Sequence, residues 1–196
     1  MKGVIASLCL TTLIAGCAGS STVTVGGRPV SIPTDAAEEH EKLIESIGIY
    51  DDPELQAYID EIGARLVANS SMPNQEFTFT LLDSPDINAF ALPGGLIYIN
   101  RGLLAYLDNE AELAGVIAHE IGHITERHHS RRKTQTITNQ IAAVSAGILT
   151  GSGDLVDAVS MYGAEIISGF GRDMELEADA AGAEFMHKSG YDADAL

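Results

Sequence analysis

Apolar residues recur every three or four positions along much of the chain, which predicts a mostly helical protein. The clearest helix begins at Asp52-Pro53, a capping residue followed by proline at the first helical position. Asn109 and Glu112 form a capping box that opens a second amphipathic stretch. Helices are predicted at residues 35–47, from 53, at 109–128, at 136–149, from 154 and at 173–190.

A strand pattern lies between two of these helices. Residues 77–81 alternate apolar side chains with threonine, as in a half-buried strand. Two further extended segments, residues 87–92 and 96–99, are separated by the turn residues Pro93-Gly94-Gly95. We therefore expect an α+β fold that is mostly helical and contains a small β-sheet beside the 109–128 helix.

Composition and charge narrow the class of protein. The chain has 196 residues, enough for one ordinary domain, and is 45% hydrophobic and only 20% charged, which excludes a disordered polymer. Its formal net charge of −17 repels phosphate backbones, so we expect no nucleic-acid partner. A basic cluster consists of Arg127, Arg131, Arg132 and Lys133. It is interpreted as a solvated helix end, with a contact to anionic lipid as the alternative.

The N-terminus has the order of segments found in signal peptides. Lys2 precedes an apolar run over residues 4–14 that is too short to span a bilayer. The following Ile14-Ala15-Gly16-Cys17 resembles the lipobox of bacterial lipoproteins, in which the cysteine is lipidated and becomes the mature N-terminus. This predicts a signal peptide at residues 1–16 and a membrane anchor at Cys17. The alternative is a plain secretory signal with a coincidental cysteine.

The segment that follows predicts the domain boundary. Residues 17–33 are rich in Gly, Ser and Thr and have no helical periodicity, so we expect a flexible tether. Residues 34–196 then form the domain. The lipobox resemblance also implies an envelope location, and the absence of aspartate at position 18 favours the outer membrane, facing the periplasm.

The strongest chemical signal is His119-Glu120-Ile121-Gly122-His123 on the predicted 109–128 helix. Its two histidines lie about 40° apart around the helix axis, so both imidazoles can face one metal ion. Glu120 lies about 100° from His119, where it can accept a proton from a water molecule that the metal activates. Two unrelated surface histidines are the alternative, which the rarity of this motif in a shuffled sequence disfavours.

A catalytic zinc site needs a third protein ligand and an open position for water. Glu175 and Asp179 share one face of the 173–190 helix whose other residues are small or apolar, where an uncompensated charge is unfavourable. We therefore expect Glu175 to be the third ligand and Asp179 to accept a hydrogen bond from a ligand histidine. The alternatives are a ligand at Glu126 or Glu165, and a salt bridge from Glu175 to Arg172.

Other polar residues near these motifs receive weaker predictions. The solvated face of the 173–190 helix is expected to carry Glu177, Ala181, Glu184 and Lys188. His128 falls on the apolar stripe of its helix, so a partly buried structural histidine is favoured over a ligand. The candidates for stabilising an oxyanion are Arg172, His128 and Tyr162.

Three motifs together resemble peptidase family M48, a family of zinc metallopeptidases. They are residues 88–95, residues 109–114 leading into the 119–123 motif, and residues 175–179, within a resemblance that spans roughly 43–191. The resemblance implies a zincin-like fold in which Glu175 binds zinc and Asp179 supports a ligand histidine. Because the family's complete domain extends further, we expect this domain to be truncated at its C-terminus.

The resemblance also suggests a substrate site. It implies that Asn88, Ala89, Phe90 and Ala91 form an edge strand beside the metal, which pairs with an extended polypeptide substrate. An ordinary sheet strand is the alternative interpretation.

These patterns lead to one functional hypothesis and one alternative. We expect a zinc endopeptidase of the cell envelope that holds one Zn²⁺ per chain and hydrolyses misfolded or misassembled envelope proteins. The alternative is a non-cleaving, chaperone-like binding module with a masked or structural zinc site. The sequence gives no indication of the oligomeric state.

Overall fold

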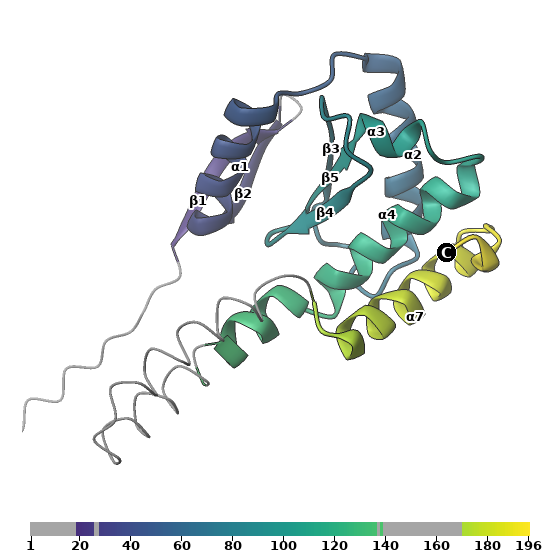
Figure 1. The fold of residues 1–196 in the computed structure, drawn as a ribbon. Helices are drawn as coiled ribbons and strands as arrows, with labels where there is room; N and C mark the ends of the chain where they lie inside the picture. The colour runs from purple at the N-terminus through teal and green to yellow at the C-terminus, as the bar shows by residue number, and fades with distance from the viewer. Residues whose placement is uncertain (1–18, 26–27, 137, 139–169) are drawn as a thin grey trace, which may run out of the picture.

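The computed structural model describes residues 19–25, 28–136, 138 and 170–196 (Figure 1). Its elements are β1 (Ser20–Val25), β2 (Arg28–Pro33), α1 (Thr34–Ile47), α2 (Pro53–Ala68), β3 (Thr78–Leu82), β4 (Ala89–Leu92), β5 (Leu96–Asn100), α3 (Arg101–Leu104), α4 (Glu110–Thr125), α7 (Arg172–Lys188) and the 3-10 turn η1 (Ala193–Ala195). Residues 128–136 are also helical. The predicted helix from 154 and most of the one at 136–149 lie outside the described residues.

Within the part of the chain that the structure describes, the predicted sheet has three strands in the order β3-β5-β4. β5 pairs with β3 in parallel and with β4 in antiparallel register. The turn between β4 and β5 contains Gly94 and Gly95 at φ angles of 97° and 92°, which L-residues with a side chain rarely adopt. Because β4 lies at the end of this strand order, it is an edge strand of the described sheet, and α4 packs against it.

The predicted tether at residues 17–33 is wrong wherever the structure describes it. Residues 20–25 and 28–33 form an antiparallel hairpin. Val23, Val25, Val30 and Ile32 are buried in one cluster with α1 and with the sheet. The reason is the alternation of valine and isoleucine with polar residues, a half-buried strand pattern that the Gly, Ser and Thr content obscured.

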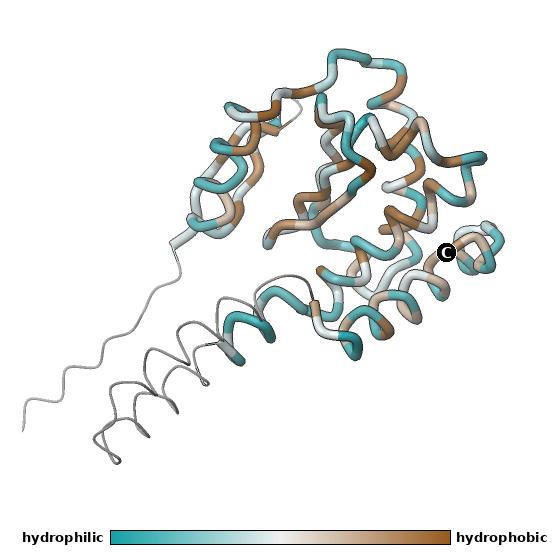
Figure 2. The backbone as a smooth tube through the Cα atoms, viewed as in Figure 1, coloured by the Kyte–Doolittle hydropathy of each residue, from teal (hydrophilic) through white to brown (hydrophobic). Residues whose placement is uncertain are grey.

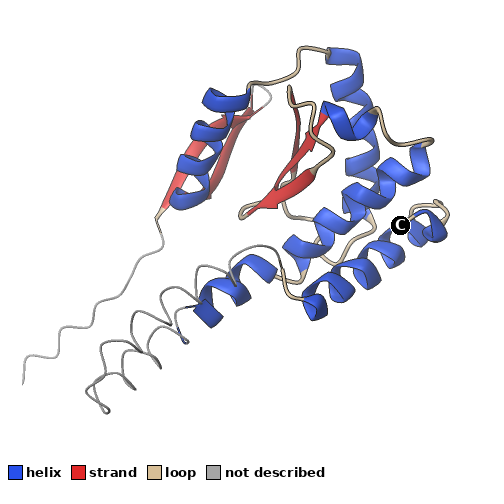
Figure 3. Cartoon of the chain, viewed as in Figure 1, coloured by secondary structure: helices blue, strands red, loops and turns tan. Residues whose placement is uncertain are grey.

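The domain consists of layers on either side of the three-stranded sheet. The hairpin and α1 lie on one side, and α2 and α4 lie on the other, with α7 beside α4 (Figure 3). Hydrophobic residues concentrate along the strands and along α4 (Figure 2). The larger core buries Ile59, Ile62, Leu66, Leu81, Ile97, Ile99, Ile117 and Ile121 almost completely. This mostly helical α+β arrangement agrees with the fold class predicted from the sequence.

Helices α4 and α7 approach so closely that their backbones touch. A Cβ atom added to Gly122 would lie 2.8 Å from the Ala178 carbonyl oxygen, and one added to Gly182 would lie 3.2 Å from the His119 nitrogen. Ala178 and Gly182 belong to the buried stripe of α7. The small residues on both helices therefore bring α7 within side-chain reach of the histidines on α4.

Membrane-spanning character was assessed for the helices of the described ranges. None of them combines the length and the apolarity needed to cross a bilayer.

Candidate active site

Local sequence determines where α4 begins and ends. Asn109 accepts a hydrogen bond from the Glu112 backbone N–H at 3.1 Å and donates to the Glu112 carboxylate at 2.9 Å, so the predicted capping pair forms. α4 ends at Thr125, three residues before the predicted end. Arg127 has a left-handed φ of 57°, and a new helical stretch starts at His128. His119 and His123 therefore lie in the last two turns of a well-capped helix.

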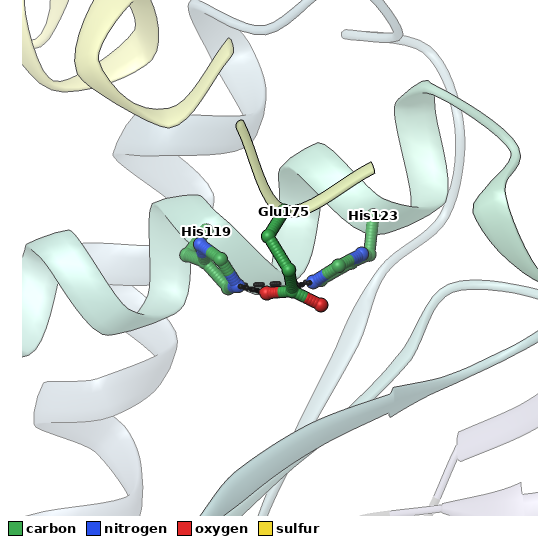
Figure 4. A group of neighbouring side chains, drawn as sticks. All are labelled: His119, His123 and Glu175. Atoms are coloured by element: carbon green, nitrogen blue, oxygen red, sulfur yellow. Dashed lines mark hydrogen bonds and ion pairs between the residues drawn. The ribbon is translucent and has the colours of Figure 1, made fainter. Parts of the chain in front are cut away.

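His119, His123 and Glu175 converge on one point between α4 and α7 (Figure 4). The Nε2 atoms of the two histidines lie 2.9 Å apart. The Glu175 Oε2 atom lies 3.4 Å from the His119 Nε2 atom and 3.8 Å from the His123 Nε2 atom. A tetrahedral zinc ion with bonds of about 2.0–2.2 Å separates its ligand atoms by about 3.3–3.6 Å. The measured spacings of 2.9, 3.4 and 3.8 Å lie on both sides of this range, so the three donors fit one zinc ion in type and approximately in spacing.

Asp179 supports His119 from one turn further along α7. The His119 Nδ1 atom lies 2.8 Å from the Asp179 Oδ1 atom. Because a carboxylate only accepts hydrogen bonds, the His119 Nδ1 atom donates this one. In the neutral imidazole the Nε2 atom then carries no proton, and it is this atom that faces His123 and Glu175. The helical-face argument predicted a hydrogen bond from a ligand histidine to Asp179, and the structure brings these two side chains together.

His123 occupies the buried side of the site. Only 2% of the residue is exposed, and burial, followed by the neighbouring His119, lowers its pKa to about 3. The Phe170 ring stacks on its imidazole with centroids 4.2 Å apart. His123 is therefore neutral across the physiological pH range, which is the form that binds a metal.

Glu120 lies beside the three donors, on the part of α4 that faces the sheet. It is 8% exposed, and burial raises its pKa to about 7, an effect that His119 opposes. A backbone hydrogen bond at Ala91, on the edge strand β4, also lowers its pKa. A carboxyl group with a pKa near neutrality can both accept and return a proton, which suits a general base.

Comparison with known proteins agrees with this geometry. Residues 53–196 match Peptidase family M48. The chain belongs to this family. It is 38% identical over 159 residues to the beta-barrel assembly-enhancing protease of Yersinia pestis, an alignment that covers 74% of this chain and 32% of that protein. Family membership favours the peptidase over the non-cleaving binding module.

Other M48 relatives extend the comparison. The beta-barrel assembly-enhancing protease of Escherichia coli K12 is 34% identical over 77% of this chain and 33% of its own length. The mitochondrial metalloendopeptidase OMA1 of Schizosaccharomyces pombe is 32% identical over 70% of this chain and 41% of its own. The chain thus spans about a third of the length of these two beta-barrel assembly-enhancing proteases.

The remaining residues singled out from the sequence fall into two groups, those that the structure describes and those that it does not. Glu126 caps the C-terminus of α4, is exposed and is not part of the donor group found among the described residues. Arg172 is exposed at the start of α7. Cys17, Tyr162 and Glu165 lie outside the described residues. The structure therefore offers Glu175, and not Glu126, as the third donor.

The predicted solvated face of α7 makes one contact that the sequence did not predict. Glu177 lies on that face with 43% of its side chain exposed, and it accepts hydrogen bonds from the His128 Nε2 atom at 3.1 Å and from Arg131. His128, predicted to be a partly buried structural histidine, is fully buried, and its Nδ1 atom lies 2.8 Å from the His123 Nδ1 atom. The contact between His128 and Glu177 joins residues 49 apart in the sequence, so helical periodicity gave no sign of it.

The basic cluster after α4 is mostly exposed, as expected of a helix end, but two of its members pair with acids. Arg131 pairs with Glu177, and Lys133 lies 3.0 Å from Asp35 at the start of α1. The 128–136 helix is thus tied to α7 and to α1.

Proposed function

We propose that this chain is a zinc-dependent endopeptidase. The observation that carries the proposal is the convergence of two imidazole nitrogens and one carboxylate oxygen, with all three donors within 4.8 Å of one another and a buried carboxyl group beside them. Three protein ligands leave a fourth position open, as catalytic zinc sites do. His119, His123 and Glu175 hold one Zn²⁺, and Asp179 orients His119.

The chemistry divides between the metal and Glu120. When bound, zinc polarises the scissile carbonyl and makes a water molecule more acidic. Glu120 accepts the proton from the attacking water and then donates it to the leaving amine. Burial raises the pKa of Glu120 to about 7, so this group can accept and return a proton near neutral pH.

Strand β4 is the proposed docking edge for substrate. The Asn100 backbone N–H donates to the Asn88 carbonyl at 3.0 Å, and antiparallel ladders alternate, so Asn88, Phe90 and Leu92 direct their backbone groups toward β5. Ala89 and Ala91 direct theirs to the opposite side, where α4 lies and where Ala91 makes its backbone hydrogen bond with Glu120. Within the predicted segment 88–91, these two alanines are the residues proposed to pair with an extended peptide, which at Ala91 would replace the contact with Glu120.

The location and the substrate class are also proposed. The lipobox-like sequence ending at Cys17 supports a lipid-anchored protein of the cell envelope, facing the periplasm from the outer membrane. Two of the relatives are named beta-barrel assembly-enhancing proteases. We propose misfolded or misassembled envelope proteins as the substrates. Mass spectrometry of the membrane fraction tests the anchor. A mature chain that is soluble and unmodified would contradict it.

Cleavage of unfolded casein tests the proposed activity. The zinc-loaded chain should cleave casein, a chelator should stop cleavage, and added zinc should restore it. Glu120→Gln should retain one zinc ion per chain and lose cleavage. Binding of casein without cleavage by the zinc-loaded wild type would instead support the chaperone-like module.

A further inference from the structure

His123 is linked to the surface of the molecule by a row of hydrogen bonds. Its Nδ1 atom lies 2.8 Å from the His128 Nδ1 atom, and the His128 Nε2 atom lies 3.1 Å from the Glu177 Oε2 atom. Arg131 then pairs with both oxygens of Glu177. The row runs from a side chain that is 3% exposed, through one that is 0% exposed, to an ion pair whose members are each 43% exposed.

The donors and acceptors in this row have only one arrangement compatible with a metal ligand. The Glu177 carboxylate accepts hydrogen bonds, so the His128 Nε2 atom carries a proton. In a neutral imidazole the other nitrogen is then an acceptor, which makes the His123 Nδ1 atom the donor to His128. The His123 Nε2 atom is left bare, and it is this atom that faces Glu175.

The same logic applies to His119 through Asp179, so both ligand histidines present a bare Nε2 atom. These two atoms lie 2.9 Å apart, at hydrogen-bond distance with no proton to share. Two lone pairs at that separation repel unless a cation lies between them. The outer hydrogen bonds thus prepare the pair of nitrogens for a cation.

We propose that His128 is a positioning residue that fixes the tautomer of His123 for zinc, acting with Glu177 and Arg131. This inference rests on the proposed zinc site. A carboxylate in direct contact with His123 would have to be buried, which is unfavourable for a charge. The neutral His128 accepts a hydrogen bond from His123 and donates one to Glu177, so the supporting carboxylate can lie at the surface. His119, whose side chain is 22% exposed, uses Asp179 directly, whose side chain is 52% exposed.

Zinc affinity of substituted chains tests the proposal. His128→Leu removes the acceptor for the His123 N–H and should weaken zinc binding by about 10–100-fold, the usual effect of losing a residue that supports a metal ligand. His128→Gln should retain affinity close to wild type, because its amide offers an acceptor toward His123 and a donor toward Glu177. Equal affinity of His128→Leu and wild type would overturn the proposal.

A surface pair provides a control that does not depend on tolerance of core substitutions. Glu177→Ala should weaken zinc binding in the same direction as His128→Leu. Glu184→Ala removes another exposed acid of α7 that pairs with a basic residue, Lys188, and should leave affinity unchanged. Equal zinc affinity of Glu177→Ala and Glu184→Ala would contradict the proposed role of the hydrogen bonds from His123 through His128 to Glu177, which we call the relay. A wild-type chain that fails to bind zinc would overturn the proposed function and the relay together.

Nitrogen-15 NMR of the zinc-loaded full chain reads the tautomers directly. The relay requires a proton on Nδ1 of His123, a proton on Nε2 of His128 and a bare Nδ1 on His128. A His128 ring with its proton on Nδ1, or with protons on both nitrogens, would overturn the proposal even if zinc binds tightly to the wild type.

Discussion

Gly122 lies directly against the backbone of Ala178, where an added Cβ atom would stand 2.8 Å from the Ala178 carbonyl oxygen. This contact joins α4, which carries His119 and His123, to α7, which carries Glu175. A wider separation of α4 and α7 would move the Glu175 carboxylate away from both imidazoles. The glycine inside the metal-binding motif therefore acts on the site through helix packing.

Gly122→Ala should weaken zinc binding about tenfold or more and lower stability by about 1–3 kcal/mol, because the new methyl group forces α7 outward. Gly115→Ala is the matched control on the same helix, since its Cβ would meet the chain near Ala195 at 3.2 Å, away from the donors. Zinc titration and urea unfolding of both variants measure the two effects. Equal zinc affinity in the two variants would contradict the role of this contact.

Glu175→Ala should reduce zinc affinity by more than the 10–100-fold typical of a supporting residue, because it removes a direct donor. Glu184→Ala, about two and a half turns further along α7, should bind zinc as the wild type does. Competition with a chelating dye measures both. If Glu175→Ala kept stoichiometric zinc at unchanged affinity, the third ligand would be another residue.

The metal-free protein should be destabilised by Glu120 at alkaline pH. Burial raises the pKa of Glu120 to about 7 from its usual 4.5, so the folded chain keeps a proton that the unfolded chain has already lost. The free energy of unfolding therefore falls as the pH rises from about 4.5 to about 7, and the loss is complete above that range. Glu120→Gln should be more stable than wild type by up to about 3 kcal/mol at pH 8 and similar to it at pH 4. Urea unfolding with a chelator present measures this, and equal stability at pH 8 would refute it.

The buried pair His40 and Tyr98 should contribute to stability away from the site. The His40 Nδ1 atom lies 2.7 Å from the Tyr98 hydroxyl, and burial lowers the pKa of His40 while it raises that of Tyr98. The neutral imidazole accepts from the hydroxyl, so Tyr98→Phe should cost about 1–3 kcal/mol by leaving a buried acceptor without its donor. Tyr106→Phe, at a residue that is 70% exposed, should change nothing. Chemical denaturation measures the stability of both variants. Equal unfolding midpoints for Tyr98→Phe and Tyr106→Phe would contradict the contribution of the His40–Tyr98 pair.

Local patterns predicted much of this structure because they depend on residues close together in sequence. Asp52 caps α2 by accepting from the Leu55 N–H at 3.0 Å, as the Asp-Pro pair indicated. The spacing of His119 and His123 and the shared face of Glu175 and Asp179 follow from helical geometry alone. These relationships were accessible without tertiary structure.

Contacts between distant segments were not accessible in this way. The hairpin was missed because a short alternation of valines was outweighed by flexible composition. The packing of Phe170 on His123 and the row through His128 to Glu177 depend on how α7 lies against α4. A buried histidine beside the motif was the available signal, but its partner could not be identified before the helices were placed together.

Anomalous scattering at the zinc edge from crystals of the zinc-loaded chain tests the central claim most directly. We predict one zinc ion bonded to Nε2 of His119, Nε2 of His123 and the Glu175 carboxylate at about 2.0–2.2 Å. Zinc bound elsewhere, or bound to the histidines with the Glu175 carboxylate outside bonding distance, would contradict it.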